Sequence, residues 1–260
     1  MAVVPESVTP AASIPSPTTT PTATLAPNPA KTPAADEQPT APVYALWAVF
    51  TRPRAGVAAD ELATASADLD AALTEIAAAG VTTRGIYDVS GLKADTDLMF
   101  WLHGESPEVV QAALRTLRRV PAIAALEPHT NLVGTHREAE FNRQHIPAFV
   151  RGVPARQWLA VYPFVRSKDW YLIRDGERSR MLAEHGRAGA AYKGVLTNTV
   201  AAFALGDYEW IVPVESDDLA ELVDMMRALR YVDARLHVIE ETPFFTGRRI
   251  TTADVAEVLG

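Results

Sequence analysis

The stretch QWLAVYPFVRSKDWYLIRDGERSRMLAEHG (157–186) places an apolar, alternating segment before a segment with helical periodicity. Alternation of this kind predicts a β-strand, and apolar residues three and four apart predict an amphipathic helix. The strand segment WLAVYPFVR (158–166) has the same texture as YALWAVFTR (44–52), much earlier in the chain. This match indicates that the chain contains one structural unit twice.

The order of the expected elements supports the duplication. Two acidic residues of the first half recur at a constant spacing in the second. Asp97 corresponds to Asp207 and Glu105 to Glu215, each 110 residues later. The expected strands are 44–50, 82–89, 98–103, 158–165, 195–205, 208–214 and 235–241, and the expected helices are 58–79, 107–119, 175–192 and 216–229. A β-α-β-β-α-β unit is the ferredoxin-like arrangement. We therefore predict an α+β fold of two such halves, whose antiparallel sheets close into one barrel with helices outside.

Residues at the ends of these segments also match helix boundaries. Ser106 and Ser216 each precede a helical pattern and are expected as N-caps, since a hydroxyl accepts from the free amides there. Gly80 follows the first helical pattern, where glycine commonly ends a helix.

Composition divides the chain into five segments. Residues 1–42 contain ten of the nineteen prolines and are expected to be a disordered tail, either solubilising or able to bind a partner. The two halves are expected at 43–120 and 157–247, followed by a C-terminal tail at 248–260. Residues 121–156 are too long for a simple connector, and long inserts often line or cover a site.

The overall composition excludes several classes of function. With a net charge of −8 and a pI near 5.3, the chain lacks the basic surface that nucleic acid requires. It has no cysteine, so disulfides, thiolate ligation and iron–sulfur clusters are excluded. No apolar run is long enough to span a membrane, and the first residues do not resemble a signal peptide. The expected location is the cytoplasm.

His185 is the first candidate site residue. Met181, His185 and Tyr192 share one face of the expected helix, and that face is otherwise largely apolar. Gly186 and Gly189 lie beside it, and each glycine costs a helix about 1 kcal/mol relative to alanine. Such a cost is explained if a flat group such as a haem lies against the helix backbone. The His185 imidazole would then be a ligand of the haem iron. The alternative is a core histidine that hydrogen bonds to a neighbouring group.

Tyr162 is the second candidate. In the strand alternation, Tyr162 and Arg166 face the same side, so a phenol lies near a cation that can bind a carboxylate. Trp170 adds another oxidisable ring nearby. Ordinary amphipathic packing is the alternative for Tyr162.

His145, in the insert, is either a solvated residue or a proton acceptor if the insert folds over the second half. The histidines expected to be structural are His103, His129, His136 and His237.

Four motifs occur in an order that resembles the coproheme decarboxylases of the chlorite dismutase-like superfamily, especially the actinobacterial branch. They are YPFVRSKDWY, MLAEHG, NTVAAFALGDYEW and VPVESDDLAELVDMMRALR. The resemblance covers roughly residues 43–247, and the second half is its specific part. It implies a dimeric α+β barrel, with two ferredoxin-like halves in each subunit, and a homopentamer.

The resemblance also implies an activity and roles for named residues. Such enzymes use hydrogen peroxide to convert two propionates of Fe-coproporphyrin III (coproheme) into vinyls, giving haem b, so that the substrate is also the redox cofactor. By position, His185 matches the iron ligand, Tyr162 the tyrosine whose radical attacks the propionate, and His145 the distal histidine. Arg166 and Trp170 match residues near the propionates. Transient contact with a ferrochelatase is a further implication.

Two other functions remain open from the sequence. Chlorite dismutases proper place an arginine over the distal haem face, whereas residues 195–205 contain no Arg or Lys. Chlorite decomposition is therefore disfavoured, although a haem peroxidase or chlorite-degrading enzyme on the same barrel is the rival enzyme class. A non-catalytic haem-binding protein is the third possibility.

Overall fold

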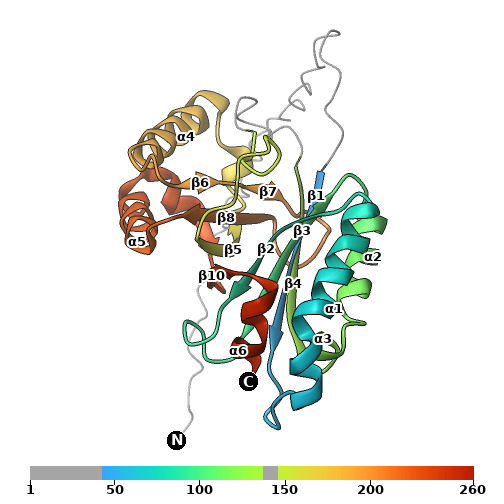
Figure 1. Ribbon diagram of the computed structural model, residues 1–260. Coiled ribbons are helices and arrows are strands. Elements are labelled where there is room, and N and C mark those ends of the chain that lie inside the picture. Colours follow the sequence, from blue (N-terminus) through green and yellow to red (C-terminus); the bar gives the residue numbers. More distant parts are fainter. Residues whose placement is uncertain (1–42, 137–145) are drawn as a thin grey trace, which may run out of the picture. The chain divides into compact units, whose positions relative to one another are not determined.

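The computed structural model describes residues 43–136 and 146–260, which form an antiparallel barrel with helices outside (Figure 1). The first half consists of β1 (Val43–Thr51), α1 (Ala59–Ala78), β2 (Thr82–Asp88), β3 (Leu98–Gly104), α2 (Pro107–Leu117), α3 (Pro121–Ala124) and β4 (Glu127–His136). The second half consists of β5 (Trp158–Arg166), η1 (Trp170–Leu172), α4 (Asp175–Ala190), β6 (Leu196–Thr197), β7 (Val200–Ala201), β8 (Trp210–Ser216), α5 (Leu219–Ala228), η2 (Leu229–Tyr231), η3 (Asp233–His237), β9 (Val238–Glu240), β10 (Phe245–Ile250), η4 (Thr252–Asp254) and α6 (Val255–Leu259).

The strand order closes the sheet into a ring. The first half runs β4-β1-β3-β2, and in the second half β5 lies between β10 and β8, with short β6 and β7 beside β8. The halves join where β2 pairs with β10, Tyr87 opposite Arg249, and where β4 pairs with β7, Thr135 opposite Ala201. Each half thus contributes one strand to each seam. The prediction of two ferredoxin-like halves closing into one barrel is confirmed.

Both seams bring backbones close together at a glycine. A Cβ on Gly134 of β4 would lie 2.3 Å from Cγ2 of Val200, and a Cβ on Gly247 of β10 would lie 2.7 Å from Cγ1 of Val89. Real Cβ atoms do not tolerate such distances, so only glycine fits both places. These residues allow the two half-sheets to approach closely enough to pair.

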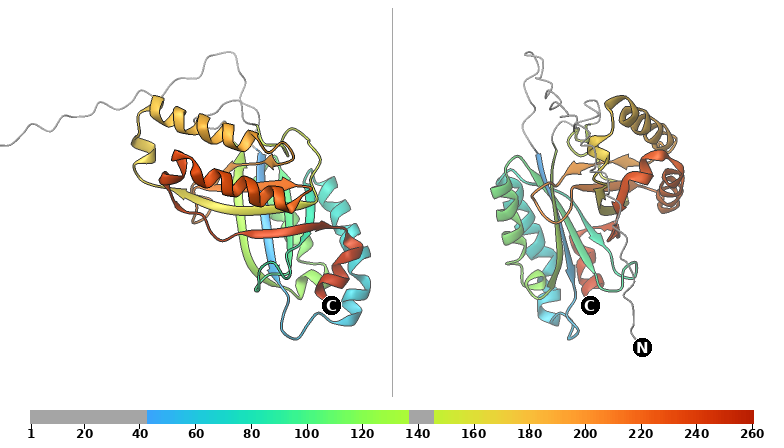
Figure 2. Two further views of the ribbon diagram at one scale, coloured as in Figure 1. Left: turned by 90° about the vertical axis from the view of Figure 1, so that its left-hand side faces the viewer. Right: turned by 180° about the vertical axis from the view of Figure 1, so that it is seen from behind.

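Apolar side chains fill two layers of the molecule. The barrel interior contains Trp47 and Trp101, whose ring centroids lie 5.1 Å apart. Outside the first half-sheet, Phe100 packs with Leu69 of α1 and Leu117 of α2. Figure 2 shows α1 and α2 on one side of the strands and α4 and α5 on the other. Among the described residues, no helix has the length and hydrophobicity that a membrane span needs.

The structure differs from the sequence prediction at the boundaries of both halves. The insert expected at 121–156 begins with α3 and β4, and β4 is a full strand that pairs along β1. The sequence of β4 shows little of the apolar alternation of a strand, because Leu132 and Gly134 are its only buried residues. The boundary at 247 falls inside β10, and the expected tail 248–260 ends in α6, whose Val255 and Leu259 are fully buried.

Three second-half elements also differ from prediction. In place of the strand expected at 195–205 there are two short strands, β6 and β7. Asn198 lies between them, and its side chain joins a buried hydrogen-bond network. The helix expected from 216 begins at Leu219, and its N-cap is Asp218 rather than Ser216. The strand expected at 235–241 is only partly present, because its first residues belong to η3 and Val238–Glu240 form the short β9 at the end of β5, whereas β10 takes the closing position. Ser106 is an N-cap, and Gly80 has a positive φ of 84° after α1, as expected.

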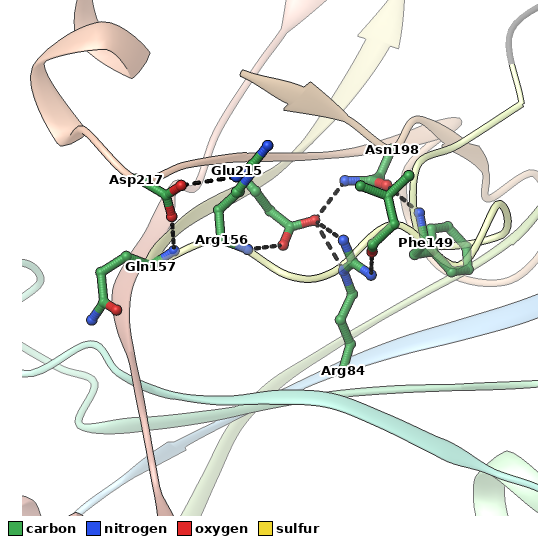
Figure 3. Close-up of polar contacts among 8 residues, drawn as sticks. Arg84, Phe149, Arg156, Gln157, Asn198, Glu215 and Asp217 are labelled. Atoms are coloured by element: carbon green, nitrogen blue, oxygen red, sulfur yellow. Dashed lines mark hydrogen bonds and ion pairs between the residues drawn. The ribbon is translucent and has the colours of Figure 1, made fainter. Parts of the chain in front are cut away.

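A buried ion pair joins the two halves (Figure 3). Glu215 of β8 is fully buried, and its Oε1 accepts from Nη2 of Arg84 on β2 at 2.7 Å. Oε1 also accepts from Nδ2 of Asn198 at 2.9 Å, while Oε2 accepts from the backbone N–H of Arg156 at 3.1 Å. Asn198 Oδ1 in turn accepts from the Phe149 N–H at 2.9 Å. One carboxylate therefore fixes β2, β8, the β6–β7 turn and the segment before β5.

We expect Arg84→Ala to lower the free energy of unfolding by about 3–5 kcal/mol, because it leaves the Glu215 charge buried and unpaired. Arg156→Ala is the matched control, since its side chain pairs with Asp217 at 2.9 Å in a largely exposed position. That exposed pair contributes about 0.2–1 kcal/mol. Urea unfolding followed by circular dichroism measures both, and equal losses for the two variants would contradict the assigned importance of the buried pair.

Candidate functional site

A cavity of ≈ 670 Å³ separates the outer face of the second half-sheet from its helices. Its lining residues come from β5, β6 and β8 on the sheet side and from α4, α5, η2 and η3 on the other. Tyr162, Arg166, Trp170 and His185 all line it. The four sequence-predicted residues within the described ranges therefore share one site.

The cavity occupies the space that the first half fills with a hydrophobic core. There, Leu69, Ile76 and Phe100 are almost fully buried between helices and sheet. In the second half, α4 has sixteen residues but buries only Arg178 and Met181. A helix is ordinarily held by the packing of its apolar face. The way α4 stands away from the sheet points to a site for a ligand.

His185 extends from the middle of α4 into this cavity. Its pKa lies below the ordinary value, first because burial disfavours the charged imidazolium and second because the Arg166 guanidinium repels it. Within the described ranges, no group hydrogen bonds to the imidazole. A neutral imidazole with a free lone pair is suited to coordinate a metal. The alternative of a core histidine satisfied by a neighbour therefore finds no support in this part of the chain.

The helix surface beside His185 is open. Gly186, Gly189 and Ala190 line the cavity, and a Cβ added to either glycine would meet no atom of the described residues within 4 Å. Protein packing therefore does not explain these two glycines. Since glycine destabilises a helix by about 1 kcal/mol relative to alanine, another reason for them is needed. A flat ligand lying against the helix backbone supplies it.

Tyr162 lies on the sheet side of the cavity, near the end of β5. Its side chain is 6% exposed, and its ring stacks on Phe244 with centroids 4.4 Å apart. The hydroxyl donates to the Met226 sulfur at 3.6 Å. Burial, with the nearby Glu241 charge as a lesser cause, raises the pKa of Tyr162 above its ordinary value. The phenol is therefore neutral and held in one orientation.

Arg166 and Trp170 lie together beside Tyr162. The Arg166 guanidinium carbon stands 4.1 Å from the centroid of the Trp170 ring, and Nη1 donates to the Ala234 carbonyl at 2.9 Å. Burial lowers the pKa of Arg166 to about 10, so the side chain remains a cation at neutral pH. A cation fixed on an aromatic face and directed at a cavity is suited to bind a carboxylate.

Further charged residues at the cavity were not expected from the sequence. Glu241 Oε2 lies 2.8 Å from Nη1 of Arg230 and 3.4 Å from Nη2 of Arg235, and Lys193 completes this set. Both arginines belong to the η2 and η3 turns, which follow neither a helix nor a strand period. For that reason no pattern in the sequence identified them. With Arg166, the described residues of the lining include four cations and, as their one carboxylate, Glu241.

The other histidines named from the sequence are His145 and four that were expected to be structural. His145 is outside the described residues, so its proposed distal position stays a prediction. His103 packs on Phe149, His129 packs on Phe245, and His237 Nδ1 lies 3.1 Å from Asp169. Neither these three nor His136 lines the cavity.

Comparisons with known proteins identify relatives. A family model described as chlorite dismutase matches residues 62–250. A coproheme decarboxylase from Mycolicibacterium smegmatis (strain ATCC 700084 / mc(2)155) is 48% identical over 217 residues, which cover 82% of this chain and 92% of that protein. The chlorite dismutase from Candidatus Nitrospira defluvii, solved in complex with imidazole, superposes with a TM-score of 0.73 at 19% identity. That alignment covers 83% of this chain and 94% of the solved chain, and it shows a shared fold.

The assigned electrostatics at His185 predict a titration. In the ligand-free protein, we expect the imidazole to titrate below the ordinary histidine pKa of about 6.5. Arg166→Gln should raise this pKa, because it removes a positive charge that disfavours protonation. Lys168→Gln, at an exposed cation of the same β5–η1 connection, is the control and should move it less. Imidazole NMR measures both. A His185 pKa unchanged by Arg166→Gln would show that the two side chains are not coupled.

Proposed function

The chain belongs to the chlorite dismutase family, and from that premise we propose that it is a peroxide-dependent coproheme decarboxylase that produces haem b. The observation that carries this proposal is the cavity in which an imidazole on α4, neutral and without a partner among the described residues, and a buried phenol on β5 line one space. The 48% identity to a coproheme decarboxylase over most of the chain supports it.

The lining residues fit an iron porphyrin. His185 offers an axial nitrogen, and the glycines beside it leave the helix surface flat enough for a planar macrocycle. Around this surface the lining is largely apolar, with Leu182, Val195 and Leu229 among its residues. A porphyrin needs an apolar face for its ring and polar groups only at its edge. The bound iron porphyrin, together with peroxide, supplies the oxidising equivalents.

The cations suit the carboxylates of coproheme. Arg166 would hold a propionate near Tyr162, because both side chains project from the same face of β5. Arg230, Arg235 and Lys193 add positive charge, and Glu241 offsets part of it. Arginine binds carboxylates through two parallel hydrogen bonds and thereby fixes their orientation. This charge pattern favours a porphyrin with several carboxylates over one with few.

Tyr162 is the proposed catalytic residue. Loss of its hydroxyl hydrogen leaves a phenoxyl that takes a hydrogen atom from the propionate β-carbon. The resulting carbon radical would give one electron to the second oxidising equivalent that peroxide supplies, and its carboxylate would leave as carbon dioxide, so that a vinyl forms. Burial keeps the phenol protonated and away from water, and stacking on Phe244 fixes its direction. His145 would accept the first proton of peroxide, and Trp170 would stand near the second propionate. These roles, a homopentamer and contact with a ferrochelatase remain predictions from the resemblance.

The rival functions have less support. Three residues of the segment 195–205 line the cavity, namely Val195, Thr197 and Thr199. The whole segment contains no Arg or Lys. The arginine expected of a chlorite-degrading enzyme therefore has no counterpart there. A protein that only binds haem would not need a buried phenol directed into the cavity.

Tyr162→Phe tests the proposal. We expect coproheme binding to be retained, because the ring and its stacking partner remain, whereas vinyl formation should fall by about 100-fold or more, the scale of a lost hydrogen-transfer group. Tyr231→Phe is the control, since Tyr231 is 87% exposed. Porphyrin products after peroxide titration are separated by chromatography. An undiminished haem b yield in Tyr162→Phe would refute the proposal.

Gly189→Ala tests the flat surface of α4. Without ligand, we expect this variant to be more stable by about 0.5–1 kcal/mol, because alanine favours the helix and its Cβ meets open space. Coproheme affinity should fall, since the same Cβ enters the ligand space. Gly176→Ala, in the first turn of α4 and away from the cavity, should leave affinity unchanged. Thermal unfolding and absorbance titration measure the two effects. Unaltered affinity in Gly189→Ala would contradict the docking of the ring on this face.

A further inference from the structure

A second tyrosine, which the proposed reaction does not use, lies one side chain away from the cavity. Trp210 lines the cavity from β8, and its Nε1 donates to the Tyr171 hydroxyl oxygen at 3.4 Å. The Tyr171 hydroxyl donates in turn to Glu209 Oε2 at 2.8 Å. An indole, a phenol and a carboxylate therefore follow one another outward from the site.

The same aromatic group continues to the surface. The Phe203 ring lies 5.3 Å from Trp210 and 6.2 Å from Tyr171, both edge to face, and Phe203 is 47% exposed. On its cavity side, Trp210 stacks on Phe164 with an interplanar angle of 11°. The Glu209 carboxylate is held by a second donor, the Arg166 N–H, at 2.8 Å. The geometry of the phenol–carboxylate pair is thus fixed by the backbone of β5.

The partners of the two tyrosines differ in one chemical respect. Tyr162 donates to the thioether of Met226, which cannot take up a proton, whereas Tyr171 donates to a carboxylate, which can. Oxidation of a phenol releases its proton, so a base at hydrogen-bond distance favours that oxidation. Burial raises the pKa of Tyr171 to about 12, which keeps the proton on the phenol until an electron leaves. Tyr171 is therefore the easier of the two phenols to oxidise.

We propose that Trp210, Tyr171 and Glu209 form a relay that removes surplus oxidising equivalents from the cavity. This inference rests on the proposed function, which supplies the oxidant. The oxidant would be the bound iron porphyrin together with one peroxide, which would supply two oxidising equivalents and release water. One electron then passes from Tyr171 through Trp210 to the porphyrin, the phenol O–H bond breaks, and its proton moves to Glu209 Oε2. A neutral phenoxyl and a neutral carboxylic acid remain, and the porphyrin retains one oxidising equivalent.

The relay is tested in a protein whose reactive propionates are absent. Tyr162→Phe protein loaded with haem b receives one equivalent of hydrogen peroxide and is freeze-quenched for electron paramagnetic resonance. We expect a tyrosyl signal, and a nitroso spin trap should label the peptide that contains Tyr171. Both should disappear in the double variant Tyr162→Phe/Tyr171→Phe and persist in Tyr162→Phe/Tyr231→Phe. A signal that survives the loss of Tyr171, or no tyrosyl signal at all, would overturn the relay.

Glu209→Gln separates proton acceptance from packing. The amide oxygen can still accept from the Tyr171 hydroxyl and from the Arg166 N–H, but it cannot hold a proton at neutral pH. In the Tyr162→Phe background, we expect the tyrosyl signal to form about 100-fold more slowly, the scale of one positioned proton acceptor. An unchanged rate would exclude Glu209 as the acceptor and overturn the relay as proposed.

Failure of the relay can be distinguished from failure of the proposed function. With Tyr162 intact, coproheme-loaded Tyr171→Phe should complete decarboxylation at stoichiometric peroxide and should lose its porphyrin absorbance sooner than the unsubstituted protein in excess peroxide. Complete decarboxylation with equal bleaching in the two proteins would overturn the relay alone. Absence of vinyl products in the unsubstituted protein would overturn the proposed function and the relay together.

Discussion

The buried carboxylate of Glu215 needs a cation beside it, and this requirement fixes how the two halves of the barrel meet. A fully buried carboxylate is tolerated only with a cation and with hydrogen bonds to its remaining lone pairs. Arg84 comes from the other half of the chain, 131 residues away, and Asn198 comes from the turn between β6 and β7. Neighbours of Asn198 on both sides, Thr197 and Thr199, line the cavity. The interaction that joins the halves therefore also fixes one wall of the site.

The two halves share a fold and differ in what lies between sheet and helices. The first half packs its helices on a continuous core, which stabilises the barrel. The second half keeps α4 away from the sheet, with His185, Gly186 and Gly189 directed into open space. The two glycines weaken the helix, and the His185 imidazole has no hydrogen-bond partner in the part of the chain that the structure describes. The apolar core between sheet and helices is therefore larger in the first half, and the cavity lies in the second.

Local periodicity explains which parts of the site could be predicted from sequence. Tyr162 and Arg166 share a face because strands repeat every two residues, and the i, i+4 spacing to Met181 placed His185 on one helix face. Arg230 and Arg235 could not be found in this way, since their 3-10 turns follow neither period. The matching positions of Glu105 and Glu215 helped to predict that the two halves are duplicates. In the structure, however, Glu105 is exposed and Glu215 is buried. That difference depends on Arg84, a distant partner that no local pattern identifies.

We propose that the cavity between α4 and the second half-sheet holds coproheme and that two of its propionates become vinyls there. The most direct measurement is the mass of the porphyrin extracted from coproheme-loaded protein before and after hydrogen peroxide is added. We expect two successive mass losses, each corresponding to one carbon dioxide and two hydrogen atoms, and ending at haem b. A porphyrin whose mass is unchanged while peroxide is consumed would contradict it.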